Sequence, residues 1–324
     1  MWFGIAGRVF LIDCHDQWSA LAVRKLVQGW FLKPLNANGT AADVIMTVRC
    51  GVEPTAIPAE LECFEVADGG TCYTDGNTVY IELDGSLVLI DEHWNHIDVW
   101  LRTEYEIDSW ILAQVLSQAF CAAMRRCGLF LLHGAGVLPP GQDNGLLIVG
   151  PSGTGKSTLT FQLTANGWGY LSDDSIFLKE TATGIRAQGL RKDFAFKQDT
   201  IAAVQLEIDE APTGGLNFKK RVPPEDLFPE CLIETAGVTS IVFPELIDSD
   251  YSRLERLDPL EVMTRLLKFC PWACYDKRTA APYLSILGDL ARRASGFALF
   301  SGRDLLHVPG AAHRLMLQVV QSHG

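Results

Sequence analysis

Residues 150–158 read Gly150-Pro-Ser-Gly-Thr-Gly-Lys-Ser-Thr158, and this stretch decides the fold. It fits the G-x-x-x-x-G-K-[ST] pattern of a phosphate-binding loop, with Gly150, Gly155, Lys156 and Ser157 at the required positions. The apolar run 145–149 predicts a buried strand before the loop, and the residues after it continue as a helix. A strand, a glycine-rich turn and a helix together direct backbone N–H groups at a phosphate. We therefore expect an α/β P-loop domain that binds a nucleoside triphosphate.

The pattern assigns a role to each portion of the loop. We expect Lys156 to bridge the β- and γ-phosphates of ATP and the Ser157 hydroxyl to bind Mg²⁺. The glycines permit positive φ angles and a close approach of the backbone to the ligand. The expected ATP contacts are Gly150, Pro151, Ser152, Gly153, Thr154, Gly155, Lys156, Ser157 and Thr158.

Composition limits the other classes of function. The chain has 324 residues, enough for two domains of roughly 100–200 residues each. A hydrophobic fraction of 48% and a charged fraction of 20% provide a large core and exclude global disorder. The net charge of −12 argues against a nucleic-acid partner or an anionic membrane, since either needs a basic face. No apolar run reaches the roughly 18–20 residues of a membrane span, and the first residues do not resemble a signal peptide.

The 9 cysteines are scattered and include no C-x-x-C pair. Cys270 and Cys274 form a lone C-x₃-C without a second pair at zinc-ligand spacing. Buried free thiols in a reducing, cytoplasmic compartment are the simplest interpretation.

The sequence changes character near residue 105. Residues 1–105 are rich in β-branched and aromatic runs separated by Asp-Gly turns, which predicts an N-terminal α+β domain. A helix over 107–126 links it to the nucleotide-binding domain, which we place at 106–324. The other elements expected in the first domain are strands at Arg8–Ile12, Val44–Val48 and Thr78–Leu83 and a helix at Gln17–Phe31.

Two short segments flank the loop with groups suited to phosphotransfer. An apolar strand over 129–137 carries His133-Gly134, and Asp173-Asp174 follow a second strand, one strand-plus-helix unit after the loop. P-loop enzymes hold a second metal-binding carboxylate at that position. One aspartate can bind Mg²⁺ while the other accepts the proton of an attacking hydroxyl. A solvated turn or a helix N-cap is the alternative, and the spacing to the loop favours the catalytic interpretation.

These segments resemble the HPr kinase/phosphorylase family, whose catalytic core is similar to that of phosphoenolpyruvate carboxykinase. The resemblance is dense over 129–178 and thins beyond it, where 238–243 and 257–261 are similar to a later strand and helix. By position it implies that Asp173 is the proton acceptor and that Asp174 lies nearer the metal. It also implies that His133 faces the phosphate site, although a buried structural histidine is the alternative.

The chain departs from the family at two places. Thr158 stands where the family enzyme carries a glutamate, and a segment from Gly189 to Lys197 replaces the glutamate- and glycine-rich signature associated with phosphorolysis. The sequence therefore gives no basis for expecting the reverse reaction. Basic residues that can stabilise the transferring group are Arg191, Lys192, Lys197, Lys219, Lys220 and Arg221, with Arg191 and Lys192 ahead of the others and a solvated surface run as the alternative.

The expected activity is an ATP- and Mg²⁺-dependent kinase, and its acceptor is expected to be a serine of a peptide or protein. The N-terminal sheet could hold such a peptide by strand addition. The alternatives are a small-molecule kinase acting on an amino acid or a sugar, and a nucleotide-binding regulator without catalysis. The resemblance also implies a homo-oligomer, for which the sequence itself shows no assembly surface.

Overall fold

The structure is a computed structural model. The structure describes residues 1–36, 41–66, 70–91, 95–103, 105–107, 109–196, 201, 220–270 and 276–322. The chain divides into two compact units. The first comprises Met1–Phe130 with residues 272–283, and the second comprises Leu131–Pro271 and Leu284–Gly324. The linking helix expected over 107–126 therefore belongs to the first unit, whose main segment ends at Phe130 rather than near residue 105.

In the first unit, the described residues form a nine-stranded sheet in the order β3-β1-β2-β4-β9-β8-β7-β6-β5. Its elements are β1 (Trp2–Ile5), β2 (Arg8–Cys14), α1 (Gln17–Gln28), β3 (Lys33–Pro34), β4 (Val44–Cys50), β5 (Glu62–Val66), β6 (Gly70–Thr74), β7 (Val79–Leu83), β8 (Ser86–Ile90), β9 (His96–Leu101) and α2 (Trp110–Arg126). The expected strands are present as β2, β4 and β7, and the Asp-Gly turns join β6 to β7 and β7 to β8. Both expected helices are shorter than predicted, since α1 ends at Gln28 rather than Phe31 and α2 begins at Trp110 rather than residue 107.

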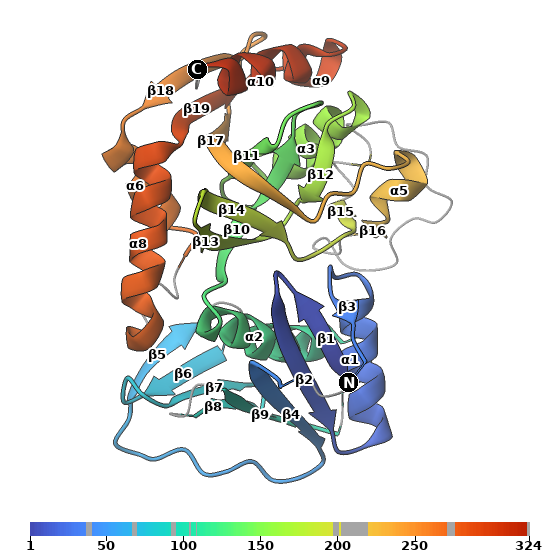
Figure 1. The fold of residues 1–324 in the computed structure, drawn as a ribbon, viewed down its shortest axis with the longest axis vertical. Helices are drawn as coiled ribbons and strands as arrows, with labels where there is room; N and C mark the ends of the chain where they lie inside the picture. Colours follow the sequence, from blue (N-terminus) through green and yellow to red (C-terminus); the bar gives the residue numbers. More distant parts are fainter. Residues whose placement is uncertain are drawn as a thin grey trace. The chain divides into compact units, whose positions relative to one another are not determined.

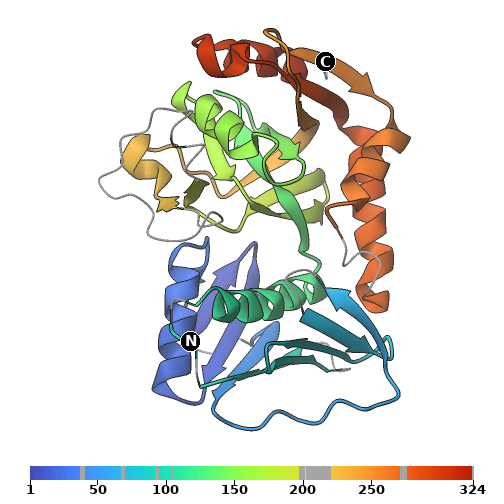
Figure 2. The ribbon, with the colours of Figure 1, turned by 180° about the vertical axis from the view of Figure 1, so that it is seen from behind.

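Two helices cover the middle of this sheet. Helix α2 packs on β8, β9 and β4, and α1 packs on β2 and β4 (Figures 1 and 2). The Asp16 carboxylate caps α1 by accepting the Ser19 N–H at 2.8 Å. The Phe120 ring of α2 lies 5.8 Å, centroid to centroid, from Phe10 of β2 and 4.7 Å from Trp30, which follows α1 in the chain. Aromatic packing therefore joins α2 to the sheet and to the segment after α1.

The second unit is also a mixed sheet with helices, so the chain has an α/β fold. Its elements are β10 (Phe130–Leu138), β11 (Asn144–Val149), α3 (Lys156–Ala165), β12 (Gly169–Ser172), β13 (Ser175–Thr181), β14 (Gly184–Gly189), β15 (Phe194–Phe196), β16 (Lys220–Val222), α5 (Pro224–Leu227), β17 (Thr235–Leu246), β18 (Arg253–Leu257), α6 (Pro259–Leu267), α8 (Lys277–Arg293), β19 (Ser295–Ser301), α9 (Asp304–His307) and α10 (Ala311–Gln321). Helix α8 contributes to both units, since the division falls between Tyr283 and Leu284.

Three neighbouring strands of the second sheet run parallel to one another. Strand β11 pairs in parallel with β17, and β17 pairs in parallel with β19 (Figure 1). They end at Val149, Leu246 and Ser301, so their carboxyl ends meet at one edge of the sheet. Strand β10 pairs antiparallel with β11 on the other side. The core is built on these strands, with Leu159 and Leu163 of α3 and Met316 and Val319 of α10 buried in the same apolar cluster. Ligands in open α/β sheets bind beyond the carboxyl ends of the strands, so we expect a ligand site at that edge.

No helix among the described residues is long and apolar enough to cross a membrane.

Candidate active site

The loop after β11 has the backbone expected of a phosphate-binding turn. Gly153 and Gly155 adopt φ angles of 90° and 91°, a left-handed conformation that residues with a Cβ rarely adopt. Gly155 is the N-cap of α3, and Lys156 is the first residue of the helix. The helix therefore begins at the loop, with its positive dipole end and its unpaired N–H groups there.

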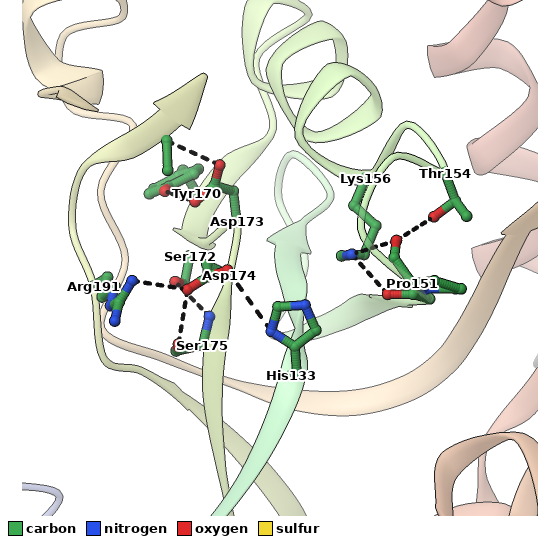
Figure 3. A network of polar contacts seen from close by, with 12 residues as sticks. His133, Pro151, Thr154, Lys156, Tyr170, Ser172, Asp173, Asp174, Ser175 and Arg191 are labelled. Carbon is green, nitrogen blue, oxygen red and sulfur yellow. Dashed lines mark hydrogen bonds and ion pairs between the residues drawn. The ribbon is translucent and has the colours of Figure 1, made fainter. Parts of the chain in front are cut away.

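Lys156 is held against its own loop. Its side chain is only 6% exposed, and Nζ donates to the carbonyl oxygens of Gly150 at 2.7 Å and Pro151 at 2.9 Å (Figure 3). The hydroxyl of Thr154 also donates to the Pro151 carbonyl, at 2.9 Å. The ammonium charge is thereby fixed at the loop, where an anion would be attracted.

A cavity of about 410 Å³ lies beside the loop, within the usual size range of small-molecule sites. It brings together five residues that the sequence singled out from three separate segments: His133, Lys156, Ser157, Asp173 and Asp174. The loop residues Ser152, Gly153, Gly155 and Thr158 also line it. Gly150, Pro151 and Thr154 instead line a neighbouring groove of about 560 Å³. The nine residues expected to contact ATP are thus divided between the cavity and the neighbouring groove.

The His133-Gly134 step positions the histidine next to the loop. Gly134 pairs with Val149, the last residue of β11, so His133 lies across from the start of the loop. A Cβ on Gly134 would lie 3.0 Å from the Ile148 carbonyl oxygen, which explains the need for glycine. The Gly134 N–H donates to the Asp174 carbonyl at 3.1 Å, which brings the aspartate pair to β10.

Asp174 lies between two potentially cationic side chains (Figure 3). Arg191 NH1 is 3.0 Å from Asp174 Oδ2, and His133 Nδ1 is 3.7 Å from Oδ1. The Ser175 hydroxyl also donates to Oδ2, at 3.2 Å. Arg191, which the sequence could place only by analogy, is therefore part of this cluster, although it does not line the cavity.

Asp173 is 2% exposed and is fixed from two directions. Its Oδ2 accepts the Ala195 N–H at 3.1 Å, and its Oδ1 lies 3.4 Å from the Tyr170 hydroxyl (Figure 3). Burial, reinforced by the negative charge of Asp173, raises the pKa of Tyr170 well above its ordinary value. The phenol therefore stays neutral at physiological pH and can donate a hydrogen bond. Sequence reasoning missed Tyr170, because no motif marks an aromatic residue three positions before the pair.

Arg221 belongs to the same electrostatic environment. It pairs directly with Ala195 across the β15–β16 ladder, so their side chains share one face of that ladder. Burial and then the nearby charge of Arg191 lower the pKa of Arg221, while Asp193, Asp174 and Asp173 oppose this shift. The basic run thus contributes a second arginine near the aspartates. Lys197 and Lys219, also singled out by sequence, lie outside the described residues, as does Cys274.

The donor set suits magnesium in chemical type. Mg²⁺ prefers oxygen ligands and is usually bound by one or two carboxylates together with phosphate oxygens and waters. Asp174 and the Ser157 hydroxyl are oxygen donors on the same cavity. Within the described portion of the chain, no group of three or more His, Cys, Asp or Glu side chains is arranged to hold a metal.

Comparison with known proteins adds little to this geometry. No known protein-family profile matches the sequence, and no curated protein sequence does. Among solved structures, the Hpr(Ser) kinase/phosphatase from Coxiella burnetii is similar over 58% of this chain and 98% of its own, with 14% sequence identity and a TM-score of 0.32. A TM-score of that size is too low to support an inference about function.

Proposed function

We propose that this protein is an ATP- and Mg²⁺-dependent phosphotransferase that moves the γ-phosphate to a hydroxyl group. The observation that carries the proposal is the convergence of Lys156, Asp173, Asp174 and His133 on one cavity at a glycine-rich helix N-terminus. A phosphate loop alone would support only triphosphate binding. The buried carboxylate beside it supplies the proton acceptor that transfer to a hydroxyl requires.

In the proposed reaction, Asp173 accepts the proton of the acceptor hydroxyl as its oxygen attacks the γ-phosphorus. A new P–O bond forms, and the bond to the bridging oxygen breaks to release ADP. The hydrogen bond from the Ala195 N–H orients the Asp173 carboxylate for this step. The Tyr170 hydroxyl lies 3.4 Å from Asp173 Oδ1 and 3.1 Å from the Asp193 carbonyl oxygen, so the two acceptors share its single proton. Lys156 lines the cavity and supplies positive charge to the equatorial oxygens, where negative charge is spread in the transition state. Arg191 and Arg221 do not line the cavity and add positive charge from behind the aspartates.

Asp174 and Ser157 are the proposed magnesium ligands. When bound, the ion would neutralise charge on the β- and γ-phosphate oxygens. Arg191 and His133 would then orient Asp174 from the side of the cluster they already occupy.

The proposed acceptor is a serine hydroxyl of a peptide or protein. His133 is 42% exposed, so the cluster is open to solvent beside Asp174, and an acceptor can approach there. Strand β5 ends the sheet of the first unit and offers an edge to which a peptide can add as a further strand. A cytoplasmic location and a homo-oligomeric assembly belong to the proposal as well, and each needs a separate measurement.

Incubation with γ-labelled ATP and Mg²⁺ tests the proposal, with a pool of serine-containing peptides and, separately, free amino acids and sugars. Label on a peptide is the expected result, and Lys156→Ala should abolish it. Label only on a small molecule would favour the small-molecule kinase. ATP binding without transfer to any acceptor would favour the non-catalytic regulator.

A further inference from the structure

The cavity at the loop extends past the phosphate-binding residues on one side. Its remaining walls come from the ends of β17 and β19 and from α9, and include Pro244, Leu246, Ser301, Gly302, Leu305 and Leu306. None of these residues belongs to a motif, and none has a role in the proposed phosphotransfer.

The order of the strands shows on which side of the phosphate loop these residues lie. The four neighbouring strands run β10, β11, β17, β19, and the phosphate loop follows β11. His133 and the aspartate pair lie on the β10 side of the loop, because Gly134 of β10 binds Asp174. The ends of β17 and β19 lie on the other side, up to two strand spacings from β11, or about 10 Å. The cavity therefore has a charged end and a second end, with the loop between them.

The second end is apolar and partly open. Leu246 is 64% exposed and Leu306 is 45% exposed, although both line a cavity. Leu246 lies over the loop, since a Cβ built on Gly155 would be 3.8 Å from its Cδ2. Ligand pockets are mostly apolar with a few polar groups, and exposed apolar side chains that line a hollow mark a surface that a ligand can cover.

This wall is also fixed in position. The Gly302 N–H donates to the Ser252 hydroxyl at 2.8 Å, and the Ser252 N–H donates to the Asp304 carboxylate at 3.1 Å. The Gln162 side-chain amide of α3 donates to the Leu305 carbonyl, which ties α9 to the phosphate-loop helix. The apolar face is therefore formed before any ligand arrives.

We propose that Leu246, Leu305 and Leu306 form the binding face for the nucleobase of the triphosphate substrate. The nucleotide then lies along the carboxyl edge of the sheet, with its base over β17 and β19 and its γ-phosphate toward Asp173. This inference rests on the proposed triphosphate binding and adds the direction in which the nucleotide lies. The binding free energy of the nucleotide then has two separable contributions, one from the contact of the base with the leucines and one from the contact of the phosphates with the loop.

Calorimetric titration tests the proposal by measuring the affinity of the full chain for Mg²⁺·ATP and for Mg²⁺·tripolyphosphate. The wild type is compared with the variants Leu246→Gln and Leu306→Gln. Both side chains are exposed, so a polar replacement is compatible with folding. We expect ATP affinity to fall about five- to tenfold as apolar contact with the base is lost, while tripolyphosphate affinity changes less than about twofold. Leu21→Gln is the matched control: Leu21 of α1 is 54% exposed, lines neither this cavity nor the neighbouring groove, and its substitution should alter neither affinity.

Unchanged ATP affinity in both variants would overturn the placement of the base, as would an equal loss for ATP and tripolyphosphate. Wild-type protein that binds neither ligand would contradict the proposed function itself, which is a distinguishable result. Photolabelling of the unaltered protein with 8-azidoadenosine triphosphate provides a test that needs no variant. Labelled peptides should contain Leu246 or residues 301–306, and labelling confined to the aspartate side of the loop would contradict the proposal.

Discussion

The guanidinium of Arg191 lies 3.0 Å from the Asp174 carboxylate, and this ion pair joins the segment after β14 to the turn between β12 and β13. The other Asp174 oxygen faces His133 at 3.7 Å. Each carboxylate oxygen therefore has a basic side chain beside it, and the carboxylate is fixed in direction next to the loop.

Replacing Arg191 should impair transfer more than binding. In Arg191→Ala, Asp174 loses its closest charged neighbour and the transferring group loses positive charge, so we expect kcat to fall about 10²–10³-fold with a smaller change in KM for ATP. Steady-state kinetics measures both. Arg186→Ala is the control, because Arg186 bonds Thr235 and should not affect either parameter. A change in KM alone would show that Arg191 acts only in binding.

Two glycine substitutions should change stability in opposite directions. In Gly145→Ala, the new Cβ would lie 2.6 Å from the Val137 carbonyl oxygen, and we expect a loss of about 1–3 kcal/mol in unfolding free energy. In Gly288→Ala, inside α8, the Cβ would meet only the movable end of Arg292 at 3.3 Å, and we expect a gain of about 0.5–1 kcal/mol. Denaturant unfolding measures both. Equal effects would contradict the close β10–β11 approach.

Cysteine reactivity should follow burial. Cys63 on β5 is exposed, whereas Cys72 is 1% exposed and burial raises the pKa of its thiol to about 12. Alkylation requires the thiolate, so iodoacetamide at neutral pH should modify Cys63 well before Cys72 in the native protein. Peptide mapping over time checks this, and the difference should disappear in denaturant. Equal rates of alkylation of the two cysteines in the native protein would contradict the burial of Cys72 on β6.

The loop and its flanking segments could be predicted because local pattern determines them. A strand, a G-x-x-x-x-G-K-[ST] run and a helix specify one another within 20 residues or so, and the structure has β11, the turn and α3 in that order. The same holds for the first-unit strands, whose alternation and Asp-Gly turns are local signals. The end of the first unit was harder to predict from sequence. Helix α2 belongs to this unit because it packs on β8 and β9, and its own sequence does not show which unit it joins.

The rest of the site depends on contacts between distant residues. Ala195 of β15 donates to Asp173 from 22 residues further along the chain, and Arg221 faces the same cluster through its pairing with Ala195. The leucine face requires β17 and β19 to lie parallel to β11 and to end together. Neither arrangement has a short-range pattern, so sequence periodicity cannot reveal it.

The measurement that tests the central claim most directly is phosphate transfer from γ-labelled ATP by wild type and Asp173→Asn, with Mg²⁺·ATP affinity measured on the same samples. Asparagine keeps the size of the buried side chain but cannot accept the proton. We predict that affinity changes less than about threefold while transfer falls about 10²–10⁴-fold. Transfer at the wild-type rate by Asp173→Asn would contradict the account.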